Sequence, residues 1–250
     1  FRRVNRFILL ALIGAHRCAL GRTLDARAAV YLTTENGNLG DTNTVLDQVF
    51  RQRSLPMPFS FINTMSNTAP FYVAQSLGVL GRNLSVSGRD LCFERGLELA
   101  RVDFDLGQVD EALIGSVDEV GATEGAAGAA VEGSCWLYLK RSREGALGEV
   151  AGIRSFPDRE ALASWWADRP DPPDGRPMLA CGATVPPEER DDWRRRTGWA
   201  VFDYLSDYGP FDTVTAYGIA TFVERGPSTV LIHLNRDRQG RYVVLTVRRY

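Results

Sequence analysis

The chain has 250 residues, of which 44% are hydrophobic and 24% charged, enough to bury a sizeable core in one large or two small domains. Its 29 basic and 31 acidic residues nearly cancel, and there is no long basic run, so the composition argues against nucleic acid and membrane surfaces as partners. Four cysteines without a CxxC pair and two histidines offer no zinc cluster, so we expect no metal, no cofactor and reduced thiols in the cytoplasm.

The N-terminal region imitates a signal peptide, because the apolar run of residues 7–15 follows three arginines. However, His16 and Arg17 stand where a small-residue cleavage site would be, and the run is too short to span a bilayer. We therefore predict a buried helix and no membrane insertion. Residues 28–34 then predict a strand.

Two helical regions are expected next, over residues 41–53 and within residues 54–81. The apolar side of the first should consist of Val45, Leu46, Val49 and Phe50. In the second region Asn67 is expected to cap a helix. The aromatic side chains of this region are expected in the core, and they are Phe59, Phe61, Phe71 and Tyr72.

Residues 83–118 form the stretch around which we expect the rest of the fold to be arranged. They predict a strand over 83–87, a sharp turn at Gly88, an amphipathic helix, a polar loop and a second strand. The apolar side of the helix consists of Phe93, Leu97, Ala100 and Phe104, and a charged side consists of Glu94, Glu98, Arg101 and Asp105. A charged stripe is usually a solvated face, so we expect the layer over this helix to be reduced.

This stretch resembles the nucleophile segment of the β-ketoacyl synthases, the condensing enzymes of the thiolase-like superfamily. In that family a strand of the type NLTVS runs into a helix whose first turn carries the reactive cysteine, and a later strand ends in a GGVD-like turn. The matching residues are Asn83, Leu84, Val86 and Ser87 in the strand and Gly115, Ser116, Val117 and Asp118 in the turn. A second match lies upstream, at Pro58, Phe59, Ser66, Asn67, Ala69, Val73, Leu77, Gly78 and Gly81.

Residues 132–156 are similar to the EGAGVLVLERLSDA element of the family and the strand after it. The resemblance implies a thiolase-like, layered α/β/α fold with an abbreviated second half. On this pattern residues 1–156 form a ketosynthase N-terminal-like half and residues 157–177 a proline-rich linker. Residues 178–250 would form a reduced C-terminal half packed on the first.

The position of the family's nucleophilic cysteine, counted forward from Ser87, is held by Asp90. A carboxylate cannot form the acyl thioester that condensation requires. The spacing from Ser87 to Asp90 approximates a capping box, and an acidic residue is favoured in a first helical turn, so a structural role is also open. Cys92 follows two residues later and would point to a different face of the helix, where a buried thiol is the common outcome.

The family also uses two histidines, in an HGTGT motif and in a GH-containing turn, and neither motif occurs here. His16 and His233 are expected to be structural or surface residues. Residues 208–212 could be what remains near the place of the second histidine, and they contain no histidine.

Loss of the cysteine and both histidines resembles the short, chain-length-factor type of ketosynthase homologue. The resemblance implies a noncatalytic subunit of a type II polyketide, polyene or fatty-acid-like synthase, with an active ketosynthase and an acyl carrier protein as partners. The dimer would form along the edge strand Asn83, Leu84, Ser85, Val86 and Ser87, and Met65 and Phe93 are candidates for lining the acyl tunnel, although both also fit a core.

Two other functions remain open from the sequence. One is an autonomous acyltransferase or thioester hydrolase that uses Cys92 as nucleophile or Asp90 as base. The other is a binding protein for acyl chains that pairs with a second copy of itself.

Overall fold

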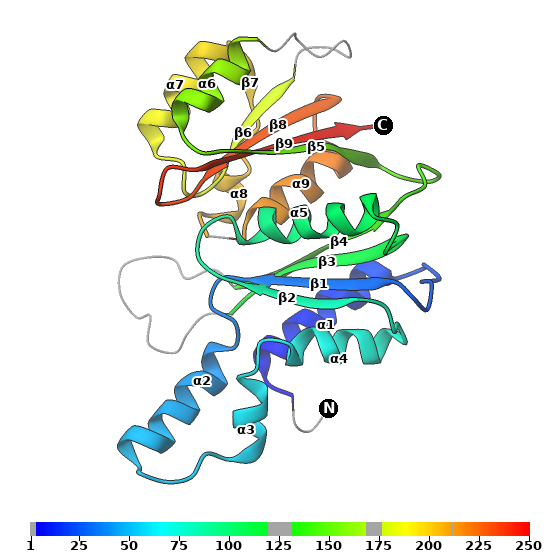
Figure 1. The fold of residues 1–250 in the computed structure, drawn as a ribbon, viewed down its shortest axis with the longest axis vertical. Coiled ribbons are helices and arrows are strands. Elements are labelled where there is room, and N and C mark those ends of the chain that lie inside the picture. The colour runs from blue at the N-terminus through cyan, green and yellow to red at the C-terminus, as the bar shows by residue number, and fades with distance from the viewer. Residues whose placement is uncertain (1–3, 120–131, 169–176, 212) are drawn as a thin grey trace. The chain divides into compact units, whose positions relative to one another are not determined.

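A computed structural model describes residues 4–119, 132–168, 177–211 and 213–250 (Figure 1). The chain divides into two compact units, Phe1–Arg141 and Ser142–Tyr250. Each unit contains one β-sheet, so the fold is of the mixed α/β class that the sequence predicts.

The sheet of the first unit is built around β1 (Ala29–Thr34), every residue of which is buried. The strand order is β2-β1-β3-β4, with β2 (Asn83–Ser87), β3 (Glu111–Asp118) and β4 (Gly133–Lys140). β2 and β3 run parallel to β1, whereas β4 is antiparallel to β3. The prediction that residues 83–87 form an edge strand is therefore confirmed.

Helices cover both faces of this sheet. α1 (Arg6–Ala19) and α4 (Thr68–Leu77) lie on one side and α5 (Cys92–Asp105) on the other, which gives the first unit its α/β/α layers (Figure 1). A Cβ on Gly96 would lie 2.4 Å from Cγ2 of Thr33, so only glycine lets α5 approach β1 this closely.

α1 is the buried helix predicted from the apolar run, and the side chain of Asn5 caps it by accepting a hydrogen bond from the amide of Ile8. Its inward side consists of Phe7, Ile8, Ala11, Leu12 and Ala15. Among the described residues, helices that combine the length and the apolar character needed to cross a membrane are absent.

The second unit holds a five-stranded sheet in the order β5-β9-β8-β6-β7. Its strands are β5 (Gly148–Phe156), β6 (Met178–Cys181), β7 (Ala200–Val201), β8 (Val230–Arg236) and β9 (Tyr242–Arg249). Its helices are α6 (Arg159–Ala167), α7 (Pro187–Thr197), α8 (Leu205–Tyr208) and α9 (Thr215–Arg225). α6 and α7 contribute Leu162 and Trp193 to a core formed with β8 and β9.

The predicted domain boundary after Phe156 is wrong. β5 pairs along its length with β9 and therefore belongs to the second sheet. The first unit accordingly ends at Arg141, and the second begins at Ser142. The predicted linker, residues 157–177, contains α6, whose N-cap Asp158 accepts a hydrogen bond from the amide of Ala161. The proline-rich part of that linker, residues 169–176, lies outside the described residues.

The helix expected over residues 41–53 is α2 (Leu39–Leu46) followed by a π-helical turn, η1 (Asp47–Arg51), and most of its apolar side is exposed. The expectation that Phe59, Phe61 and Phe71 lie in the core is wrong, because all three are exposed. On α5 the expected charged face is not uniformly solvated, because Glu94 is fully buried.

A buried polar network fixes α5 to the sheet. The hydroxyl of Tyr31 on β1 donates to Oδ2 of Asp103 at 2.5 Å, and Nη1 of Arg82 lies 2.7 Å from Oδ1 of the same carboxylate. Burial and then the hydrogen bond to Asp103 raise the pKa of Tyr31. Asp103 thus joins α5 to β1 and to the residue that precedes β2.

Replacement of Asp103 by alanine should lower the free energy of unfolding by about 2–4 kcal/mol, because it leaves the Tyr31 hydroxyl buried without an acceptor. Asp105→Ala is a matched control, since Asp105 is exposed on the same helix and pairs with Arg101 at 3.6 Å; it should cost less than about 1 kcal/mol. Urea denaturation measures both, and equal losses would contradict the assigned role of the network.

In the second unit, His233 on β8 is fully buried, and its Nε2 lies 2.7 Å from the hydroxyl oxygen of Tyr204. Burial lowers the pKa of His233 to about 3. The folded chain therefore keeps this ring neutral, while the unfolded chain takes up a proton once the pH falls below about 6.5.

Stability should consequently decline as the pH falls from about 6.5 towards 3, with His233 alone contributing about 1.4 kcal/mol per pH unit. Comparison of pH-dependent unfolding between wild type and His233→Gln isolates this contribution, and His16→Gln serves as the control. A ring NMR signal of His233 in the folded protein that titrates near pH 6 would overturn the assignment without needing a variant.

Candidate functional site

The carboxyl ends of the parallel strands β1, β2 and β3 converge with the start of α5 in the first unit. This edge is the usual place for ligands in open α/β sheets. Oδ1 of Asp118, at the end of β3, accepts hydrogen bonds from Oγ1 of Thr34 at 3.0 Å and from the amide of Glu35 at 2.8 Å. The ends of β1 and β3 are thereby held in fixed register.

The turn between β2 and α5 has unusual backbone geometry. Asp90 and Leu91 both adopt left-handed conformations, with φ of 60° and 57°. Two such non-glycine residues in succession are energetically costly and concentrate at functional positions. A sharp turn from strand to helix is also how α/β enzymes present a nucleophile.

Asp90 is part of this turn and not of the helix, since α5 begins at Cys92 with Leu91 as its N-cap. The expectation that Asp90 acts as a first-turn residue in a capping box with Ser87 is therefore wrong. Leu91 has no polar side-chain atom and makes no capping hydrogen bond. Asp90 is half-buried at this turn.

Cys92 is buried as the first residue of α5. Its Sγ lies 3.2 Å from the carbonyl oxygen of Thr34 and 3.1 Å from that of Val86, so the S–H acts as a donor to the backbone. Two carbonyl oxygens would repel the negative charge of a thiolate. The geometry favours a structural thiol over a nucleophile.

The two tunnel candidates occupy different environments. Phe93 on α5 is fully buried, while Met65, in the turn between α3 (Pro58–Asn63) and α4, is exposed. Their role in lining a tunnel stays a prediction. Asn67 does hold the N-cap position of α4, but its side chain makes no capping hydrogen bond.

The hydrogen bonds of the two histidines are to residues outside this strand edge. Nε2 of His16, on α1, lies 3.0 Å from Oγ of Ser76, and His233 contacts Tyr204 within the second unit. In the region proposed for the second family histidine, the hydroxyl of Tyr208 lies 2.7 Å from Oγ1 of Thr221. Residue 212 of that region lies outside the described residues.

Sequence reasoning missed two features of the site. The left-handed conformation of Leu91 has no residue-type signal, because only glycine and asparagine commonly mark such positions. The second feature is Glu119, which directly follows Asp118 and whose Oε1 accepts a hydrogen bond from the amide of Gly40 at 2.7 Å. Burial raises the pKa of Glu119. The sequence signal for Glu119 was its position directly after Asp118, at the end of a predicted strand.

No protein-family model matches this sequence. No curated protein matches it either. Solved structures do match, and three of them show how far the likeness extends. The ishigamide ketosynthase/chain length factor superposes with a TM-score of 0.75 at 18% identity, covering 99% of this chain and 81% of that chain.

A type II polyketide synthase acyl-carrier protein in complex with its ketosynthase bound to the hexaketide gives a TM-score of 0.78 at 12% identity, with 100% and 83% coverage. A β-ketoacyl synthase from Burkholderia phymatum STM815 gives 0.75 at 13% identity, with 100% and 83% coverage. At these identities the likeness establishes the fold and leaves the activity to the residues of this chain. The chain has the thiolase-like fold of the ketosynthases and chain length factors, with α/β layers that match these proteins across nearly its whole length.

Proposed function

We propose that this chain is a noncatalytic, chain-length-factor-like subunit that pairs with an active ketosynthase and acts on acyl chains carried by an acyl carrier protein. The observation that carries the proposal is the turn before α5, where Asp90 occupies the position that the family resemblance assigns to a nucleophilic cysteine. A carboxylate there cannot hold an acyl group as a thioester.

The surrounding chemistry supports the same conclusion. Decarboxylative condensation needs a thiolate and donors that stabilise the enolate formed when carbon dioxide leaves. Cys92 donates its S–H to backbone carbonyls, and His233 is fully buried against Tyr204. The partner subunit would supply the catalytic cysteine and histidines, while this chain would help to shape the acyl tunnel, in a complex that we expect in the cytoplasm.

The edge of the first sheet offers a route to pairing. The amide of Val30 donates to the carbonyl of Arg82 at 2.8 Å, and the amide of Gly88 donates to the carbonyl of Thr34 at 3.2 Å. Because peptide groups alternate in direction along a strand, the even-numbered residues of β2 face β1. The backbone N–H and C=O of Ser85 then face the open edge, where a partner strand can pair.

Ser85→Pro tests this route, because proline removes the outward N–H and leaves the bonds to β1 in place. Co-expression with a candidate ketosynthase should yield a complex whose affinity falls at least tenfold in the variant. Ser85→Ala is the control, since it keeps the backbone donor and removes only a buried hydroxyl that has no hydrogen-bond partner among the described residues. Failure of the wild-type chain to bind any such ketosynthase, or to alter product length, would refute the proposed function.

Intact-protein mass spectrometry separates this function from the autonomous acyltransferase or hydrolase. Incubation with acyl thioesters should add no acyl mass to the wild-type chain, because the Cys92 thiol is buried and hydrogen-bonded to carbonyls. An adduct that disappears in Cys92→Ser would instead establish Cys92 as a nucleophile and overturn the noncatalytic assignment.

A further inference from the structure

The loop between β1 and α2 contains the only asparagine of the sequence that a glycine follows, Asn36 before Gly37. Asn36 is exposed, and Gly37 has a left-handed backbone with φ of 67°. The loop lies at the carboxyl end of β1, where the hydroxyl of Thr34 and the amide of Glu35 donate to Asp118 of β3. A covalent change at Asn36 would therefore occur at the edge of the candidate site.

Asparagine is chemically labile in proteins, because its side chain can close a succinimide ring with the amide nitrogen of the next residue. Here the nitrogen of Gly37 attacks Cγ of Asn36, a C–N bond forms, and the bond from Cγ to the side-chain nitrogen breaks. That nitrogen takes the proton of the Gly37 amide and leaves as ammonia. Glycine favours the reaction, since it has no Cβ to hinder the approach and populates more backbone conformations than other residues.

Water then opens the ring at one of its carbonyl carbons. Opening at Cγ converts Asn36 to aspartate. Opening at the main-chain carbon converts it to isoaspartate, in which the chain runs through Cβ and Cγ and is longer by one methylene. In both cases the hydroxyl of the water completes the new carboxyl group, and the other hydrogen of the water goes to the nitrogen of Gly37. Each product has a carboxylate in place of a neutral amide.

A hydrogen bond to Thr34 restrains the reacting nitrogen. The amide of Gly37 donates to Oγ1 of Thr34 at 3.0 Å, and that hydroxyl donates to Oδ1 of Asp118 at 3.0 Å. Thr34 is only 2% exposed, so water competes little for these bonds. The nitrogen of Gly37 must give up its bond to Thr34 before it can lose its proton and turn towards Asn36. Local opening of the loop therefore controls the rate.

We propose that Asn36 is a site of spontaneous deamidation, and that the hydrogen bond from Gly37 to Thr34 sets its rate in the folded chain. Water is the co-reactant. This inference goes beyond the proposed function and is independent of it, because the reaction takes place within one loop and needs no partner subunit.

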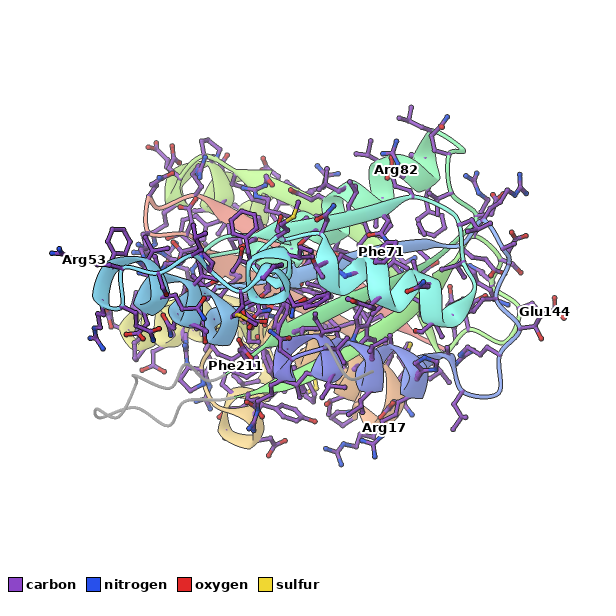
Figure 2. All side chains as sticks on the ribbon, turned by 90° about the horizontal axis from the view of Figure 1, so that it is seen from below. Arg17, Arg53, Phe71, Arg82, Glu144 and Phe211 are labelled. Atoms are coloured by element: carbon purple, nitrogen blue, oxygen red, sulfur yellow. The ribbon has the colours of Figure 1, made fainter. Side chains whose placement is uncertain are left out.

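Deamidation would disturb the start of α2. Oδ1 of Asn38 accepts a hydrogen bond from the amide of Asp41 at 3.1 Å, and Nδ2 of Asn38 donates to the carbonyl of Asn63 at 2.9 Å. The additional methylene of isoaspartate, two residues earlier, shifts these contacts. α2 and η1 lead from the loop towards Arg53, which lies at the far end of this segment in Figure 2. A small change of direction at the loop therefore becomes a larger displacement at Arg53.

Incubation of the purified chain at mildly alkaline pH, followed by peptide mass spectrometry, tests the site. Asn36 should deamidate at least tenfold faster than Asn67, which is also exposed but precedes Thr68. Electron-transfer fragmentation should identify isoaspartate among the products. Asn36→Gln should abolish the change, because the longer side chain would have to close a larger and less favourable ring.

Thr34→Val tests the restraint, since valine has nearly the same shape and removes the acceptor for the Gly37 amide. This variant should deamidate at Asn36 at least threefold faster than wild type, and hydrogen exchange of the Gly37 amide should accelerate with it. Thr44→Val is the matched control, because the hydroxyl of Thr44 donates to the carbonyl of Gly40 within α2, and it should leave both rates unchanged.

Urea gives the same comparison without a variant, because unfolding releases the Gly37 amide from Thr34. Deamidation of Asn36 in the wild-type chain should then also accelerate at least threefold. Equal rates at Asn36 and Asn67 in the folded chain would overturn the assignment of the site. A rate at Asn36 that stays the same in urea would overturn the restraint by Thr34, even if Thr34→Val fails to fold.

Discussion

The close packing of α5 on β1 is the constraint on which the first unit depends. Gly96 lets the helix approach Thr33, and Asp103 anchors its far end through Tyr31 and Arg82. With the helix fixed in this way, the short segment between β2 and α5 has little freedom and must turn sharply. The left-handed residues Asp90 and Leu91 are the result of that geometric demand.

The strained turn between β2 and α5 bears on the role of this segment, because it carries the carboxylate of Asp90. In an active condensing enzyme of the resembled family, this segment presents a thiol, and here it presents Asp90. The sulfur that remains nearby, Cys92, is used as a backbone hydrogen-bond donor inside the helix start. The strained turn thus carries a carboxylate, and the proposed noncatalytic role rests on this observation.

Much of the fold could be predicted from the sequence, because local patterns determine it. The buried helix at residues 7–15, the strand ending at Thr34 and the edge strand with its following helix all depend on apolar periodicity and turn residues. The place of Asp90 just after the edge strand also followed from spacing within one segment. These features need no knowledge of distant contacts.

Other features were decided only by the tertiary structure. β5 joined the second sheet because β9, almost a hundred residues later, supplied its partner edge, and no local pattern specifies which distant strand will pair. Glu94 became buried and the apolar side of α2 became exposed for a similar reason, since periodicity shows that a helix has two faces but not which face meets another element. The sequence alone determined the local elements and the place of Asp90 just after the edge strand, whereas long-range pairing and packing decided the unit boundary, the exposed apolar side of α2 and the backbone strain at Leu91.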